Sequence, residues 1–230
     1  MAVLRSLIKV SVVVLGAGLV LSGCSTTKLG AAAIVGNQRI TVATLDTEVT
    51  DLSVAAKQYP GTVNLTATQE TQQTLTWLIR FQINEQLARQ AGITISQAQA
   101  QTALSTIYAQ AKSAAESEGV TNVTLALIMA ANGIPPNMSA ELGRYQAIET
   151  QYIEQINGGK IPTATAAQTA TTAKLTRAQC VAAKNLKIEV NPQFGRFNYT
   201  EYEIVSASGT VSRAEGPAKA VSLAGLTPAC

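Results

Sequence analysis

The side chains that most often perform catalysis are scarce or isolated in this 230-residue sequence. There is no histidine, which removes the Ser-His-Asp arrangement, imidazole metal ligation and histidine-based proton transfer together. Three carboxylates, Asp46, Glu48 and Asp51, stand close together and could be read as an acid–base pair. A solvated helix start accounts for them more simply, because the helix dipole favours carboxylates near its N-terminus. The sequence therefore predicts no enzyme, with no catalytic, cofactor-binding or metal-binding residue.

The cysteine with the clearest chemistry, Cys24, follows an apolar run near the N-terminus. Arg5 and Lys9 supply positive charge, and residues 7–21 are otherwise mostly apolar or Gly. The run is shorter than the roughly 20 apolar residues that a transmembrane helix needs. An apolar run of this length, ended by small residues, is typical of a signal peptide.

The four residues Leu21-Ser22-Gly23-Cys24 resemble the lipobox of bacterial lipoproteins. In that family the cysteine thiol accepts a diacylglyceryl group and the cysteine becomes the new N-terminus. The alternative is an ordinary anchor helix with a chance cysteine. The resemblance implies a signal peptide over residues 1–23 and fatty acyl chains such as palmitate on Cys24. It also implies an extracytoplasmic chain that is anchored to the bacterial cell membrane, since two acyl chains make a stable anchor.

Two further cysteines, Cys180 and Cys230, remain after Cys24. Two thiols are too few for a structural zinc site, which needs four ligands. In an oxidising compartment they could form a disulfide that ties the end of the chain to an earlier helix, or they could stay as two free thiols. The sequence leaves both alternatives open.

Charge is low and almost balanced over the part of the chain that would remain after cleavage. The whole sequence has 17 basic and 14 acidic residues, and two of the basic ones, Arg5 and Lys9, belong to the leader. Charged residues make up 13% of the chain, without a basic stripe. This pattern argues against a nucleic-acid partner.

Apolar spacing predicts a mainly α fold with a small β element that joins the two ends of one domain. Gly36-Asn37 is typical of a tight hairpin turn, and Thr41 or Thr44 can begin a first helix that ends near Tyr59. Ile34-Val35 and Ile188–Val190 are the apolar strands available to pair. Further helices are predicted over residues 66–91 (with Thr68 as its cap), 96–118, 123–131, 139–157 and 165–185, the last opened by Thr163 or Thr165.

Three stretches together resemble the SurA/PrsA-type N-terminal chaperone domain of extracytoplasmic foldases. These are "AAIVGNQRITVATLD", "LIRFQINEQLARQAGITISQAQAQ" and "VNPQFGRFN", and the resemblance runs from about Ala31 to Asn198. It implies a helical domain over residues 31–206, preceded by a lipid-anchored linker at 24–30 and followed by a flexible tail at 207–230. Gly36-Asn37 replaces the Asn-Gly that the family often has, which puts only the turn type in doubt.

Many members of that family carry an inserted parvulin-type prolyl isomerase domain, which this chain lacks at the corresponding place. Only "NGGKIPTAT", residues 157–165, stands between the last two predicted helices. The absence of histidine also removes side chains that are usual in parvulin sites. The resemblance therefore implies a chaperone-like module without isomerase activity.

Client binding is predicted at a groove between the helix that bears Trp77 and Phe81 and the helix that bears Ala173. Apolar residues cover well over half the circumference of the first helix, so neighbours or a ligand must enclose it. Large aromatic residues at helical spacing are more often core than groove. The leading hypothesis is a lipoprotein that binds unfolded secreted or envelope proteins. The alternative is a structural or scaffold lipoprotein that recruits one cell-envelope partner.

Overall fold

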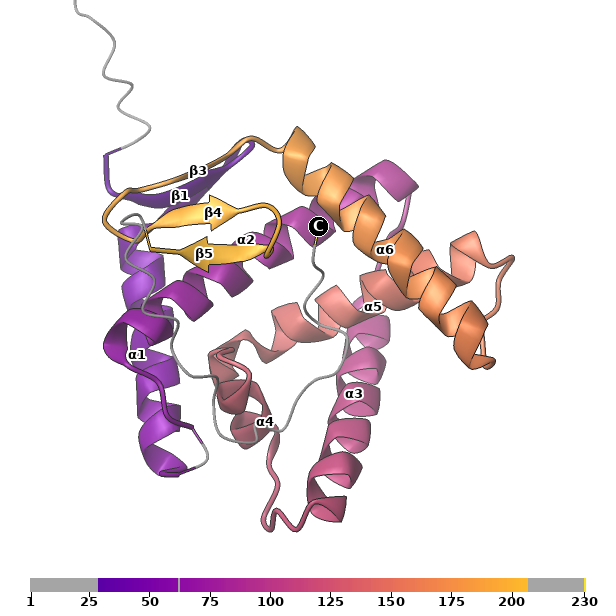
Figure 1. Cartoon of the computed structure of the whole chain (residues 1–230), viewed down its shortest axis with the longest axis horizontal. Coiled ribbons are helices and arrows are strands. Elements are labelled where there is room, and N and C mark those ends of the chain that lie inside the picture. The colour runs from indigo at the N-terminus through magenta and orange to yellow at the C-terminus, as the bar shows by residue number, and fades with distance from the viewer. Residues whose placement is uncertain (1–28, 62, 207–229) are drawn as a thin grey trace, which may run out of the picture.

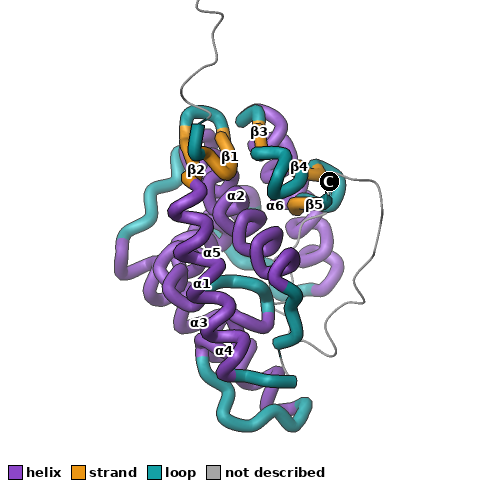
Figure 2. Tube along the Cα trace, turned by 90° about the vertical axis from the view of Figure 1, so that its left-hand side faces the viewer, coloured by secondary structure: helices purple, strands orange, loops and turns teal. Residues whose placement is uncertain are grey.

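The computed structural model describes residues 29–61, 63–206 and Cys230. Over these residues the chain forms six α-helices, a short 3₁₀ helix and two small sheets. Figure 1 and Figure 2 show the strands together at one end of the molecule, with the helices extending away from them. The predicted mainly α class with a small β element is therefore confirmed.

The first sheet joins the beginning and the end of the domain. Strands β1 (Ala31–Val35), β2 (Gln38–Thr41) and β3 (Ile188–Val190) lie in the order β2-β1-β3, and both pairs are antiparallel. Val35 pairs with Ile188, which confirms the predicted pairing of the two ends. Gly36 has a φ of 59° at the first position of the β1–β2 loop, where a type II′ turn requires glycine. The order Gly-Asn therefore suits this turn.

Side-chain caps begin the first three helices. Helix α1 (Val42–Gln58) follows Thr41, whose hydroxyl accepts a hydrogen bond from the backbone N of Thr44. Helix α2 (Ala67–Ala91) begins with a capping box of Thr66 and Gln69, so the prediction of Thr68 as its cap is wrong. The reason is the Gln three residues after Thr66, which completes the box. Helix α3 (Gln97–Ser117) follows Ser96, which forms a second capping box with Gln99.

The remaining α-helices lie where the sequence predicts them, and a short 3₁₀ helix that it does not predict stands among them. They are α4 (Leu125–Ala131), the 3₁₀ helix η2 (Pro136–Met138), α5 (Ser139–Ile156) and α6 (Thr165–Asn185). Helix α6 begins at Thr165, one of the two residues predicted to open it, and its N-cap residue Ala164 makes no side-chain hydrogen bond.

Helix α2 runs through the centre of the molecule and is buried on most sides (Figure 1). One face packs on the first sheet and on α6 through Leu75, Ile79, Ile83 and Leu87. Another face, with Trp77 and Phe81, packs on α3, α4 and α5. Neighbouring elements therefore enclose the apolar faces of α2, which is one of the two outcomes that the sequence predicts.

A second hairpin covers α2 near the C-terminal end of the domain. Strands β4 (Arg196–Asn198) and β5 (Glu203–Val205) pair antiparallel. The backbone N of Ile204 donates to the hydroxyl of Thr76 at 2.9 Å, which ties β5 to α2. Of the predicted tail at 207–230, only Cys230 lies within the described residues.

Candidate functional site

The groove predicted from Trp77, Phe81 and Ala173 is not formed by these residues. Trp77 is 3% exposed and Phe81 is 7% exposed, and both belong to the core between α2 and α5. Their rings and that of Tyr145 lie 5.7 to 5.9 Å apart between centroids. The indole N–H of Trp77 donates to the carbonyl of Asn132. Ala173 is exposed on α6, away from this cluster.

The interface between α2 and α6 is closed by small and aliphatic side chains. Leu175, Ala182 and Ala183 of α6 are buried in one cluster with Ile79 and Ile83 of α2. Alanine side chains let two helix backbones approach closely, so the small residues of α6 close the space that the prediction expected to stay open.

A groove lies instead between α3 and α5. Its volume is about 580 Å³, and we call it the α3–α5 groove. Gln and Thr side chains alternate along it with small apolar ones. The lining residues are Ala98, Gln99, Thr102, Ala103, Thr106, Ile107, Gln110, Gln146, Ala147, Thr150, Gln151, Glu154 and Ile161.

The two helices are held together beside this groove by a close backbone approach. An added Cβ at Gly143 of α5 would stand 2.6 Å from the carbonyl oxygen of Ala100 on α3, so only glycine allows the contact. Arg144 donates to both carboxylate oxygens of Glu85 on α2 and to the carbonyl of Ile95. Gly143 and Arg144 therefore fix α5 against α3 and α2 at the start of the groove.

The chemistry of the α3–α5 groove suits reversible binding of polypeptide. Side-chain amides both donate and accept hydrogen bonds, so they can pair with the backbone of an extended segment whatever its sequence. Ile161 is one of the four exposed large apolar residues in the described part of the chain and stands at the groove. Glu154 is the one charged residue among those lining it.

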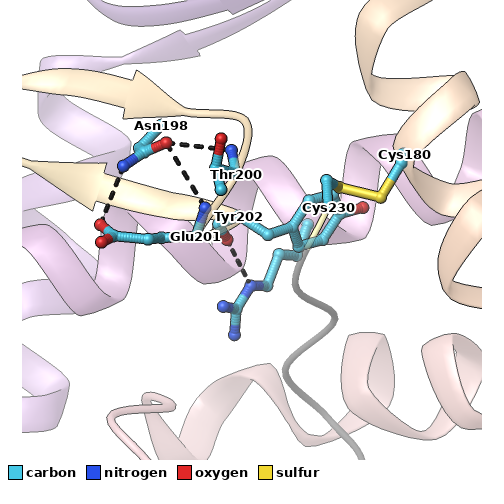
Figure 3. The surroundings of a disulfide bond; sticks show 7 residues. Cys180, Asn198, Thr200, Glu201, Tyr202 and Cys230 are labelled. Atoms are coloured by element: carbon cyan, nitrogen blue, oxygen red, sulfur yellow. Dashed lines mark hydrogen bonds between the residues drawn. A yellow bond between two sulfur atoms is a disulfide. The ribbon is translucent and has the colours of Figure 1, made fainter.

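A second hollow lies on the outer face of α6, with a volume of about 920 Å³. It contains Ala173, Arg177, Val181 and the two sulfur-bearing residues Cys180 and Cys230. The structure joins Cys180 to Cys230 by a disulfide, with the Cα atoms 5.7 Å apart (Figure 3). This bond fastens the last residue of the chain to α6.

Cys230, held to α6 by the disulfide, also lies at the turn of the β4–β5 hairpin (Figure 3). The backbone N of Cys230 donates to the carbonyl of Thr200 at 2.9 Å. Asn198 braces the turn, because its Oδ1 accepts from the backbone N of Thr200 and its Nδ2 donates to the carboxylate of Glu201. Cys230 is thus held by two interactions, the disulfide to Cys180 and the hydrogen bond to Thr200.

A buried polar network links α2, α5 and α6 beneath the hairpin. Gln179 of α6 donates to Glu149 at 2.7 Å and to the hydroxyl of Tyr145 at 3.3 Å, and also reaches Asn84. Glu149 is 8% exposed. Burial raises the pKa of Glu149 to about 7, although the hydrogen bonds from Gln179 and Tyr145 oppose the shift. Burial also raises the pKa of Tyr145 well above its ordinary value.

The three carboxylates that the sequence places together on α1 have different surroundings in the structure. Asp46 is exposed, and Asp51 accepts a hydrogen bond from the backbone N of Asn137 at 2.9 Å. The first turn of α1 holds no acidic residue, so the helix dipole does not explain them. Burial raises the pKa of Glu48, and its neighbour Asp51 adds to the shift. Asp51 connects α1 to η2.

Comparison with known families now identifies the kind of domain. The family model of the SurA-like N-terminal domain matches residues 1–138. The chain belongs to this family. No curated protein and no solved structure matches it. The matched range of the SurA-like domain includes α1 to α4 and η2, so the α3 wall of the groove lies within it and the α5 wall follows it.

Lipidation of Cys24 and the absence of a metal site are two further predictions about this SurA-like protein. Cys24 lies outside the described residues, so its lipidation stays a prediction. None of the helices in the described ranges has the length and apolar character to cross a membrane. In those ranges, no three or more Cys, Asp or Glu side chains gather in a way that could hold a metal ion.

Sequence reasoning missed the α3–α5 groove and the buried polar groups Arg80 and Glu149. Each charged residue interrupts an apolar pattern, which is the signal that could have been used. Arg80 stands between Ile79 and Phe81, and Glu149 follows Ile148. The groove had no comparable signal, because Gln and Thr on a helix surface are typical of an ordinary solvated face.

Proposed function

We propose that this protein is a membrane-anchored chaperone module that holds unfolded segments of secreted or envelope proteins. Membership of the SurA-like N-terminal domain family is the observation that carries this proposal. Binding would be reversible and non-covalent. The module would therefore delay aggregation of a client without changing its bonds.

The α3–α5 groove is the surface that fits this activity best. Its Gln and Thr side chains can pair with the backbone of any extended segment, while Ile107, Ile161 and the alanines provide apolar contact. Exposed large apolar residues are scattered singly over the described surface, which favours weak binding over tight capture. Weak binding suits a protein that must release its clients.

Anchoring would be through acylated Cys24, which the lipobox-like residues 21–24 support. A disulfide between Cys180 and Cys230 agrees with an oxidising, extracytoplasmic location. Metabolic labelling with a fatty acid tests the anchor. We expect label in the parent chain and none in Cys24→Ala, and label that persists in the variant would refute the assignment.

An aggregation-suppression assay on the full chain tests the chaperone activity and its location together. The variant Thr102→Glu/Thr106→Glu adds two charges to exposed residues that line the groove. Its matched control, Ser105→Glu/Ala109→Glu, adds the same charges to exposed residues of α3 outside the groove. We expect suppression by the parent and the control and a clear loss in the groove variant.

If the two variants suppress aggregation equally, clients bind at another surface. If the parent chain does not suppress aggregation, the chaperone function is refuted, and a scaffold lipoprotein with a single envelope partner is the alternative. Isomerase activity is not expected, since α5 and α6 are joined by the short segment 157–164. A prolyl-isomerisation assay that finds no acceleration by the full chain would agree with this.

A further inference from the structure

Arg80 of α2 is a buried cation in an unusual environment. Its side chain is 3% exposed, and its guanidinium carbon lies 5.0 Å from the ring centroid of Trp77 and 5.6 Å from that of Tyr202. Two aromatic rings therefore hold the guanidinium in a fixed position and favour its positive charge. Burial nevertheless lowers the pKa of Arg80, because the surroundings solvate a charge poorly.

The guanidinium of Arg80 has few polar partners in the described part of the chain. Its Nε donates to the carbonyl of Tyr202 at 3.1 Å. No carboxylate of residues 29–61, 63–206 or 230 lies within the 4.0 Å of an ion pair with it. Glu203 and Glu149 act on it only at longer range. The Nη groups are thus donors without an acceptor among these residues.

Arg80 lines a pocket of about 240 Å³ between α2, the end of α4 and strand β5. We call it the Arg80 pocket. Its wall is made of amide and hydroxyl groups together with Trp77, and Glu203 is exposed at its edge. The other lining residues are Gln69, Gln72, Gln73, Thr76, Asn132 and Ile204. A buried cation with free donors that opens into a polar pocket is a site for an anion.

We propose that the Arg80 pocket binds a carboxylate group. The planar guanidinium presents parallel N–H donors that match the two oxygens of a carboxylate. One negative charge would balance the single charge of Arg80. A dianion such as phosphate would add an excess of negative charge beside Glu203, and it would therefore bind less well. The carboxylate can come from a small free acid or from the C-terminus of a polypeptide.

The protein carries its own reporter for this site. Trp77 is the only tryptophan in the sequence, it lines the pocket, and it contacts Arg80. A carboxylate that pairs with Arg80 changes the field at the indole ring, so tryptophan fluorescence follows binding. The experiment titrates the full chain, purified in detergent, at constant ionic strength set with sodium chloride.

Matched pairs of probes distinguish the effect of charge from that of shape. They also distinguish a small free acid from the C-terminus of a polypeptide. N-acetylglycine is compared with its neutral amide, and a short peptide with a free C-terminus is compared with the same peptide amidated. We expect a saturable change with N-acetylglycine and none with either amide. Saturation by the free-ended peptide as well would assign the site to chain ends, and its failure would assign the site to small acids. An equal response to acid and amide, or a linear one, would overturn the proposal.

Two variants test the roles of the charges. Arg80→Lys removes the planar pair of donors and is expected to weaken binding at least tenfold, but it also affects the contact with Tyr202. Glu203→Gln is a surface change that leaves this contact intact. It removes a repelling charge, so it should tighten binding roughly threefold. Unchanged or weaker binding in Glu203→Gln would contradict the proposed position of the carboxylate.

Discussion

The α2–α6 interface and the α3–α5 groove are both built with small side chains, yet one is closed and the other is open. At the first, Ala182 and Ala183 bring α6 close to aliphatic residues of α2. At the second, Gly143 allows a similarly close approach, but Gln and Thr side chains line the space beyond it. Burial of uncharged polar groups without hydrogen-bond partners costs free energy. The Gln and Thr side chains therefore stay in contact with solvent, and the space between them stays open. The polarity of the side chains, rather than their size, separates the two regions.

The largest expected effect comes from the bond that fastens the chain end to the closed region. Cys180→Ser/Cys230→Ser opens a loop of 50 residues. The loop-entropy model gives a loss of about 4 kcal/mol in the free energy of unfolding, before any strain is subtracted. Urea denaturation of the parent and the variant measures it, and reductant should lower the parent to the level of the variant. Alkylation of both thiols in the native, non-reduced protein would show that the bond is absent.

The next effect is a pH dependence of the polar network that joins α5 to α6. The pKa of Glu149 is raised from 4.5 to about 7 in the fold, so the folded protein holds a proton that the unfolded chain releases. Stability from this group is complete below pH 4.5 and is lost as the pH rises to 7. The loss amounts to about 3 kcal/mol. Urea denaturation at pH 5 and pH 8 measures it.

Glu149→Gln is the control for this pH dependence, since the amide keeps a carbonyl for Gln179 and cannot ionise. The chain has no histidine, so few other groups titrate between pH 5 and pH 8. Burial also raises the pKa of Glu48 and of Glu203, which adds a dependence of the same sign to both proteins. The difference between parent and variant therefore isolates Glu149, and equal slopes would contradict the buried-carboxylate explanation.

The sequence predicts the elements better than it predicts their surfaces. Apolar spacing, Thr41, Ser96 and Gly92 mark helix ends through local chemistry, and the structure has these ends. Gly92, with a φ of 68°, ends α2 as predicted. Local signals decide these features, and so one sequence is enough to find them.

The position of a groove depends on which faces meet in space, and here the prediction was wrong. The spacing of Trp77 and Phe81 fits both a core face and a binding face, and only the contacts with Tyr145 show that it is core. The predicted groove between α2 and α6 is closed, because Ala182 and Ala183 of α6 pack in one cluster with aliphatic residues of α2. Gly143 and Ala100 are 43 positions apart in the sequence, so their contact has no local signal.

A substitution in α6 distinguishes a closed α2–α6 interface from an open one. Ala183 is fully buried, so Ala183→Leu forces extra atoms into a packed core. We expect the free energy of unfolding to fall by about 2 kcal/mol. The same change at exposed Ala173 should alter it by less than about 0.5 kcal/mol. If both variants have the free energy of unfolding of the parent, there is a space between α6 and α2, as the sequence predicted.

The smallest expected effect concerns the contact beside the α3–α5 groove, where two terms oppose each other. Gly143→Ala gains helix propensity of up to about 1 kcal/mol, but its Cβ meets the Ala100 carbonyl, a backbone atom that cannot rotate away. We expect a net loss of about 1 kcal/mol in urea denaturation, as α5 moves away from α3. Ala114→Gly, at an exposed position of α3, measures the propensity term alone.

Because the walls of the groove separate, suppression of client aggregation should change in Gly143→Ala and stay unchanged in Ala114→Gly. If Gly143→Ala instead raises the free energy of unfolding by as much as Ala114→Gly lowers it, α3 and α5 do not touch at Gly143. The groove would then have no fixed width.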